Sequence, residues 1–282
     1  MRASRIVQIP PNRSSSMRTA IVCLSLVAVL LTGCAGKKKA EYTERPVEDI
    51  YNEAIDLIQQ KKYSDSTEKF DEVERQHPYS VWATKAQIMA AYAYYQANRY
   101  DDAIVALDRF IQLHPANSEV AYAYYLKALS YYEQISDVDR DQKMTELALT
   151  SLKDIVTRFP QSKYARDAKL KLDLTNDHLA GKEMEIGRYY LDQGNYLAAI
   201  NRFKIVVNQY QTTTHVPEAL HRLSEAYYAL GVPEEAKKFA AVLGYNFPGS
   251  EWYIDSFELV EKKKVRQVAK PEKKWYQIWK GF

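Results

Sequence analysis

A pattern of small and apolar residues that repeats along the chain constrains its fold more than any other feature. The clearest copy spans residues 81–118 and predicts two short helices joined by a turn over residues 98–100. Small side chains at Ala91 and Ala103 would let the two helices approach closely, and Pro115 would end the second helix. Such a helix pair cannot bury its apolar face alone, so it needs neighbours of the same kind.

Five copies obey one rule: a small residue, an apolar residue or alanine four positions later, and a proline eight positions after that. The fourth copy has Gln211 in place of the proline. A serine follows four of the five closings, at Ser80, Ser118, Ser162 and Ser250. Proline followed by serine predicts that one helix stops and that the next is capped. The small residues that define the five copies are Ser66, Ala103, Ala148, Ala199 and Ala236.

A second small position lies twelve residues before the first, at Ala54, Ala91, Gly187 and Ser224. Together the two positions resemble the tetratricopeptide repeat, a helix-turn-helix unit of about 34 residues. We therefore expect an all-α helical solenoid of five repeats in two sub-bundles. The wide spacing from Ala103 to Ala148 predicts an insertion near residues 136–141. The wider spacing from Ala148 to Ala199 predicts a long helix, from about Ala165 to Gln193, that joins the sub-bundles.

The amino terminus has the features of a bacterial export signal. Arg13 and Arg18 precede an apolar run over residues 20–31, which is too short to cross a bilayer as a helix. The following Leu-Thr-Gly-Cys motif ends at Cys34 and resembles the lipobox of bacterial lipoproteins. That resemblance implies cleavage before Cys34 and attachment of diacylglycerol and an acyl chain to it. Translation starts at either Met1 or Met17.

Maturation changes the charge of the chain. The full sequence carries 39 basic and 36 acidic residues, and four of the basic residues precede Cys34, which leaves 35. The apparent net charge of +3 therefore belongs to the signal and does not predict nucleic-acid binding. Cys23 also lies in the signal, so the mature chain has no second cysteine with which to form a disulfide.

The sequence shows no catalytic or metal-binding constellation. The 5 histidines are dispersed along the sequence. His77 and His114 each directly precede a repeat-closing proline, which indicates equivalent loop positions rather than a metal site. No zinc, phosphate-binding or nucleophile motif appears. We therefore expect neither an enzyme nor a bound cofactor.

The predicted organisation has five parts. Residues 1–33 form the signal, and 34–46 form a polar tether. Repeats one to three occupy 47–164 and form a client-receiving half, and 165–260 hold the long helix and repeats four and five as a partner-docking half. A basic, aromatic extension follows at 261–282. This extension either contacts a partner or a lipid surface, or is simply solvated.

A solenoid of this type acts through a groove lined mainly by the first helix of each repeat. Tyrosine and asparagine on these helices can bind an extended peptide with little loss of rotamer freedom. The alternative is that about half of the tyrosines pack between helices, as we expect of Tyr94. The candidate groove residues are Tyr51, Asn52, Tyr92, Tyr95, Tyr122 and Tyr125.

Several motifs outside the repeat rule resemble the BamD (ComL) family of outer-membrane assembly lipoproteins. They are the AYAYY of residues 91–95, the ALDRFIQLHP of 106–115, the acidic insertion and the FPQSKYARDA of 159–168. The resemblance implies a lipid-anchored outer-membrane subunit on the periplasmic face, which belongs to the machinery that folds β-barrel proteins. It also implies that unfolded precursors bind the amino-terminal repeats. The periplasmic domains of BamA, with other assembly lipoproteins, would dock the carboxy-terminal half.

In repeat four the family's Asn-Arg matches Asn201 and Arg202, which implies a docking contact with a carboxylate of BamA. The alternative is that Arg202 is an ordinary exposed arginine. A second function also stays open at this point, a tetratricopeptide-repeat lipoprotein that serves a pilus, secretin or cell-division complex.

Overall fold

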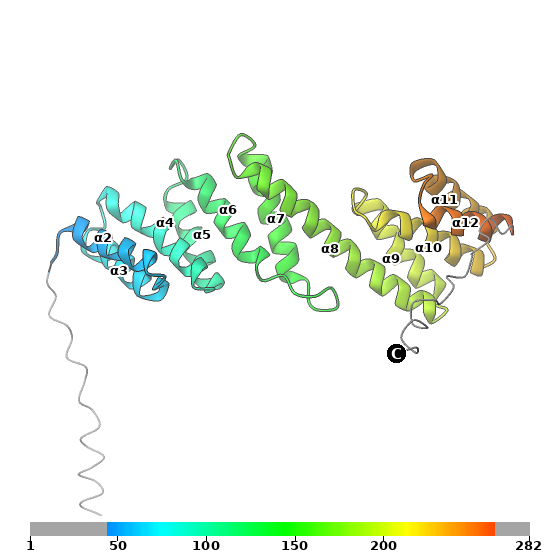
Figure 1. Ribbon diagram of the computed structural model, residues 1–282, viewed down its shortest axis with the longest axis horizontal. Coiled ribbons are helices and arrows are strands. Elements are labelled where there is room, and N and C mark those ends of the chain that lie inside the picture. Colours follow the sequence, from blue (N-terminus) through cyan, green and yellow to red (C-terminus); the bar gives the residue numbers. More distant parts are fainter. Residues whose placement is uncertain (1–43, 263–282) are drawn as a thin grey trace, which may run out of the picture. The chain divides into compact units, whose positions relative to one another are not determined.

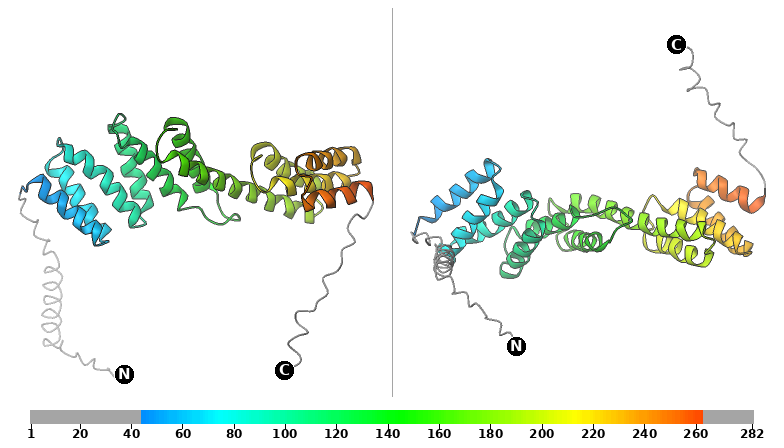
Figure 2. Two further views of the ribbon diagram at one scale, coloured as in Figure 1. Left: turned by 45° about the horizontal axis from the view of Figure 1, so that its top comes forward. Right: turned by 90° about the horizontal axis from the view of Figure 1, so that it is seen from below.

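The computed structural model describes residues 44–262, and all regular structure in this range is helical (Figure 1). Consecutive helices pack against one another in chain order, as Figures 1 and 2 show. The elements are α2 (Val47–Gln59), α3 (Tyr63–Gln76), α4 (Val81–Gln96), α5 (Tyr100–Leu113), α6 (Val120–Tyr132), α7 (Lys143–Arg158), α8 (Ala165–Asp192), α9 (Tyr196–Gln209), α10 (Val216–Ala229), α11 (Pro233–Asn246) and α12 (Glu251–Glu261). They form five helix pairs followed by α12, which confirms the predicted all-α solenoid.

The two small positions of each repeat meet where the paired helices come closest. All five residues at the first position, and the four predicted at the second, are completely or almost completely buried. In repeat one the Ser66 hydroxyl donates a hydrogen bond of 2.9 Å to the backbone carbonyl of Ala54. In repeat five the Ser224 hydroxyl donates to the carbonyl of Ala236 at 3.0 Å. A serine side chain can reach the facing backbone only if the helices lie very close, so the small residues set the spacing within each pair.

Large apolar side chains fill the space beside these contacts. Phe70, Leu107, Leu152 and Phe203, each four residues after the small position, are at most 1% exposed. At the same position in repeat five Ala240 is 7% exposed. The core continues from one pair to the next, because α3 packs on α4 and α5 packs on α6.

The turns within the repeats also follow one plan. The turn between α4 and α5 covers residues 97–99, one residue earlier than predicted, because Tyr100 already begins α5. Its central residue Asn98 has φ 58°. Lys61, Gly194 and Gly231 occupy the same place in three other repeats and also have positive φ. Glycine and asparagine adopt this left-handed conformation at little cost, whereas Lys61 is less suited to it. His77 and His114 are equivalent too, because each ends its helix with φ near −130°.

The prediction that four serines cap the following helices was largely wrong. Ser80 does so, since its hydroxyl accepts a hydrogen bond of 3.1 Å from the Ala83 amide. Ser250 occupies the N-cap position of α12, but its hydroxyl makes no capping bond. Ser118 lies one residue before the Glu119 N-cap of α6. Ser162 lies in the turn before α8, and its buried hydroxyl has no partner among the described residues. At Ser118 and Ser162 the chain makes one further turn before the helix begins.

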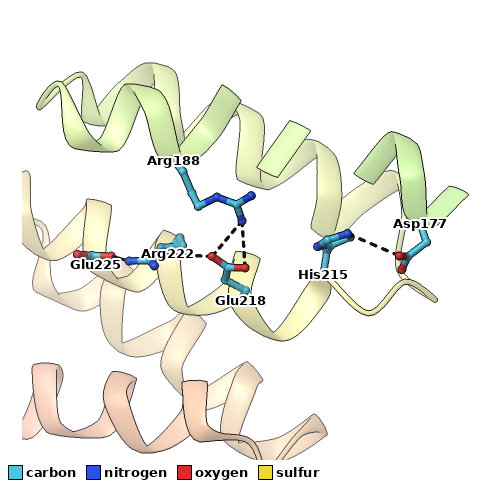
Figure 3. A network of polar contacts seen from close by, with 6 residues as sticks. All are labelled: Asp177, Arg188, His215, Glu218, Arg222 and Glu225. Carbon is cyan, nitrogen blue, oxygen red and sulfur yellow. Dashed lines mark hydrogen bonds and ion pairs between the residues drawn. The ribbon is translucent and has the colours of Figure 1, made fainter. Parts of the chain in front are cut away.

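The long helix and the insertion lie where the spacing predicts them. Residues 133–142 connect α6 to α7, and α8 has 28 residues. On one side α8 packs against α7, and on the other side against α9 and α10. A polar network shown in Figure 3 holds its carboxy-terminal part, where Arg188 donates to both carboxylate oxygens of Glu218 on α10 at 3.1–3.2 Å. Asp177, nearer the middle of α8, accepts hydrogen bonds from the Thr214 amide and hydroxyl and lies 3.6 Å from His215.

Some predictions fall outside the described residues. These are the signal, the lipidated Cys34, most of the 34–46 tether, and the extension beyond Lys262. The predicted extension begins inside the structure, because Glu261 is the last residue of α12.

The contact between α8 and α9 yields a first prediction. A β-carbon added at Gly187 would lie 2.4 Å from Cε1 of Phe203, so Gly187→Ala must displace a buried ring. We expect a loss of about 1–3 kcal/mol in the free energy of unfolding, reduced by the better helix propensity of alanine. Urea unfolding followed by circular dichroism measures it.

Gly249→Ala is the matched control, because a β-carbon there meets no atom within 4 Å and its φ is not in the left-handed range. Equal stability of the two variants would contradict the close helix approach at Gly187.

Candidate functional site

The structure brings together four of the six predicted groove residues. Tyr92 and Tyr95 lie on α4, Tyr122 and Tyr125 lie on α6, and these two helices contact each other. A spacing of three residues places both tyrosines of a pair on one face of a helix. All four side chains are half-buried, so part of each ring remains accessible to solvent.

A fifth tyrosine, Tyr164, joins this group from the residue that precedes α8. Its ring is stacked on that of Tyr125 at 4.9 Å and lies 5.5 Å from that of Tyr122. Tyr164 is not among the predicted groove residues, although it belongs to the FPQSKYARDA motif at the start of the long helix. We call Tyr92, Tyr95, Tyr122, Tyr125 and Tyr164 the tyrosine cluster.

Carboxylates surround the tyrosine cluster. The Tyr125 hydroxyl donates to Asp167 at 2.6 Å, and the Tyr95 hydroxyl donates to Glu133 at 3.3 Å. Burial, reinforced by Glu133, raises the pKa of Tyr95 to about 12. Burial and then the bond to Asp167 raise the pKa of Tyr125 as well. Both hydroxyls are thus engaged with carboxylates, and burial keeps them protonated well above pH 7.

The remaining two groove candidates do not join the tyrosine cluster. Tyr51 packs on the core of repeat one, with ring distances of 5.5 Å to Phe70 and 4.9 Å to Trp82. Asn52, the next residue on α2, is exposed. Tyr94 packs between helices as expected, against the cores of repeats one and two.

The candidate docking residue Arg202 already has a partner within the chain. Its Nη1 donates to Glu183 on α8 at 3.0 Å, and the two side chains are 37% and 16% exposed. Asn201, the neighbouring residue on α9, is exposed. The sequence could not reveal this ion pair, because the two residues belong to different helices and no spacing rule connects them.

Within residues 44–262, no cluster of three or more His, Cys, Asp or Glu side chains could hold a metal ion. Nor does that range contain a helix that is both long and apolar enough to span a bilayer.

Comparison with known proteins identifies the family. The sequence model of YfiO, described as an outer membrane lipoprotein, matches residues 43–243. A Caulobacter vibrioides protein named outer membrane protein assembly factor BamD is 52% identical over 251 residues, which cover 88% of this chain and 82% of the relative. The chain belongs to the BamD family.

Other members of the BamD family match at greater distance. The Rickettsia prowazekii member is 50% identical over 84% of this chain and 95% of its own length. A Neisseria meningitidis member is 34% identical over 86% and 96%. Among solved structures, a tetratricopeptide-repeat protein of Thermus thermophilus has a TM-score of 0.36 and 17% identity over 77% of this chain and all of that one. The helix pairing within this chain, rather than that distant similarity, establishes its fold.

The environment of Tyr95 predicts how stability depends on pH. Unfolded Tyr95 loses its proton near pH 10, whereas the folded residue keeps it up to a pH of about 12. The folded state therefore binds more protons in this window. Its stabilisation is complete below pH 10 and is lost as the pH rises through 12. Urea unfolding between about pH 9.5 and 11.5 measures the decline, which Tyr95→Phe should make shallower.

Tyr79→Phe is the control for this titration, because the Tyr79 side chain is fully exposed. The same change of slope in both variants would show that burial at Tyr95 is not the cause.

Proposed function

We propose that the protein is a lipid-anchored periplasmic subunit of the outer-membrane β-barrel assembly machinery. In this proposal the tyrosine cluster receives unfolded outer-membrane protein precursors, and the surface of α9 around Arg202 docks the periplasmic domains of BamA. Two relatives named as outer membrane protein assembly factors support this role, because the chain matches each of them over most of its length. Neither the repeat nor the comparisons favour a pilus, secretin or cell-division complex.

The observation that carries the proposal is the gathering of half-buried tyrosines from α4, α6 and the start of α8. Tyrosine offers a large, stiff ring and loses little side-chain entropy when it binds. A surface of adjacent rings can bind apolar and aromatic side chains without demanding one sequence. This is the requirement for a receptor that accepts many unfolded clients.

The carboxylates beside the rings refine the expected chemistry of the client. Asp167 and Glu133 accept from tyrosine hydroxyls, and Glu119 lies near Tyr122. Their negative charge disfavours acidic client segments through like-charge repulsion. We therefore expect a preference for segments that combine aromatic side chains with neutral or basic neighbours.

The docking half of the proposal depends on the capacity of Arg202 for a second partner. A guanidinium has five N–H donors, so the contact with Glu183 leaves room for another carboxylate. The exposed Asn201 beside it can add a neutral hydrogen bond. Cys34, which lies outside the described residues, is the proposed lipid anchor, and Asp or Glu residues of BamA are the proposed partners of Arg202.

A crosslinking experiment tests the client surface. A photoreactive residue in place of Tyr92 or Tyr95 in the intact protein should capture outer-membrane precursors during their synthesis in cells. The same replacement at Tyr79, which is fully exposed but lies on the α3–α4 connection, should capture few. Mass spectrometry identifies the adducts. Equal capture at Tyr79, or adducts only with neighbouring subunits, would contradict a client role.

A charge exchange tests the docking surface. Arg202→Glu should weaken co-purification with BamA, but it also places two carboxylates together and should cost on the order of 1 kcal/mol of stability. Adding Glu183→Arg re-forms the ion pair with its charges exchanged. We expect this double variant to regain the melting temperature of the wild type but not BamA binding. If BamA binding returns together with stability, Arg202 has a structural role only.

A further inference from the structure

Two equivalent surface hollows lie between the turns of consecutive repeats, but their linings differ. The first is bounded by residues 61–65 and Ala97, between the turns of repeats one and two, and has a volume of about 270 Å³. The second is bounded by residues 194–198 and Leu230, between the turns of repeats four and five, and has a volume of about 380 Å³. The lining positions correspond one to one, because each residue of the second hollow is 133 positions after its counterpart.

We call the first the charged turn hollow and the second the apolar turn hollow. Lys61, Lys62 and Asp65 of the former correspond to Gly194, Asn195 and Ala198 of the latter. Leu197 and Leu230 of the latter correspond to Ser64 and Ala97 of the former. Leu197 is 69% exposed and Leu230 is 37% exposed, and the adjacent Val232 is 41% exposed. The same backbone can therefore carry a charged, solvated lining, so the exposed leucines are not a requirement of the fold. Exposed apolar side chains that gather in a hollow mark an interaction site.

The carboxy-terminal end of the described chain points toward the apolar turn hollow. His221 on α10 contacts Ser256 on α12 at 2.8 Å, and Gly244 near the end of α11 lies against Tyr253 near the start of α12. Helix α12 therefore runs back beside α10, toward the turn at 230–232. It has 11 residues against 14 in α11, so it ends roughly one helical turn short of that edge.

The sequence that continues from Lys262 matches the apolar turn hollow in chemistry. Residues 263–282 contain seven basic residues and one acidic residue, together with Trp275, Trp279 and Phe282. These three aromatics recur at steps of four and three, which would place them on one face of a helix. The edge around the hollow, residues 192–198 and 229–235, has three acidic residues and no basic ones. The charged turn hollow instead offers Lys61 and Lys62, which would repel a basic segment.

The chain is also long enough to reach. Trp275 lies thirteen residue steps after Lys262, a distance of up to about 43 Å when the chain is extended. Helix α10, alongside which α12 runs, is only about 21 Å long. Because the segment is tethered close to the apolar turn hollow, its effective concentration there is high.

We propose that the apolar turn hollow is the docking site of the chain's own carboxy-terminal segment, 263–282. Trp275, Trp279 and Phe282 cover Leu197, Leu230 and Val232, and the lysines of the segment lie against Asp192, Glu234 and Glu235. The docked segment shields this apolar surface from solvent. This proposal is independent of the client and docking roles described above.

Disulfide trapping in the intact mature protein tests the contact. We compare Leu230→Cys with Ala97→Cys, the matching position of the charged turn hollow, each combined with Trp279→Cys. Mild oxidation should give an intramolecular disulfide at least about tenfold more readily with Leu230→Cys, because only that hollow holds the segment. Equal yields, or no disulfide in either variant, would overturn the proposal. A disulfide that joins two chains would assign the hollow to a second copy instead.

Hydrogen exchange tests the same contact with the lining residues intact. Replacing Trp275, Trp279 and Phe282 by alanine should speed amide exchange several-fold at 193–198 and 229–235, and leave 60–65 and 97–102 unchanged. Circular dichroism checks that the variant stays folded. Unchanged exchange at the apolar turn hollow would overturn the proposal. So would protection that appears only when another subunit binds and persists in the alanine variant, because another protein would then be the occupant.

Discussion

The close approach of two helices within each repeat is the contact on which the rest of the structure depends. Ser66 and Ser224 show this close approach directly, because the hydroxyl of each donates a hydrogen bond to a backbone carbonyl of the paired helix. Gly187 shows the same close approach, since Phe203 occupies the space that a β-carbon at Gly187 would need. Once the paired backbones are this close, the neighbouring Phe70, Leu107, Leu152 and Phe203 are forced into the interior. This packing therefore constrains the core and the turns to recur in each repeat.

Contacts governed by this repeat were predictable from the sequence. The small positions, the turn at 97–99, the insertion and the long helix follow from spacing, because each must preserve the same local packing. The serine caps were not predictable in the same way, since a proline only stops a helix and leaves the path to the next one open. At Ser162 the chain makes an extra turn, and the hydroxyl is buried away from the helix start.

The candidate site was predictable only in part, for a related reason. Tyr92, Tyr95, Tyr122 and Tyr125 lie on first helices, so the repeat itself brings them together. Tyr164 lies four residues after a repeat-closing proline, as Trp82 and Trp252 do, so the repeat could also have indicated it. The partners Glu133, Asp167 and Glu183 lie in other elements, where helical periodicity gives no information.

The length of α8 has a consequence for how such a chain can evolve. One continuous helix of 28 residues carries the packing surfaces of repeat three at its start and of repeat four at its end. Inserting one residue into a helix rotates everything beyond it by about 100° and advances it by about 1.5 Å. A single insertion near the middle of α8 would therefore turn the packing surface of repeat four relative to that of repeat three. The number of residues in α8 therefore sets the angle between the packing surfaces of repeats three and four, and point substitutions on the surface of α8 leave this number unchanged.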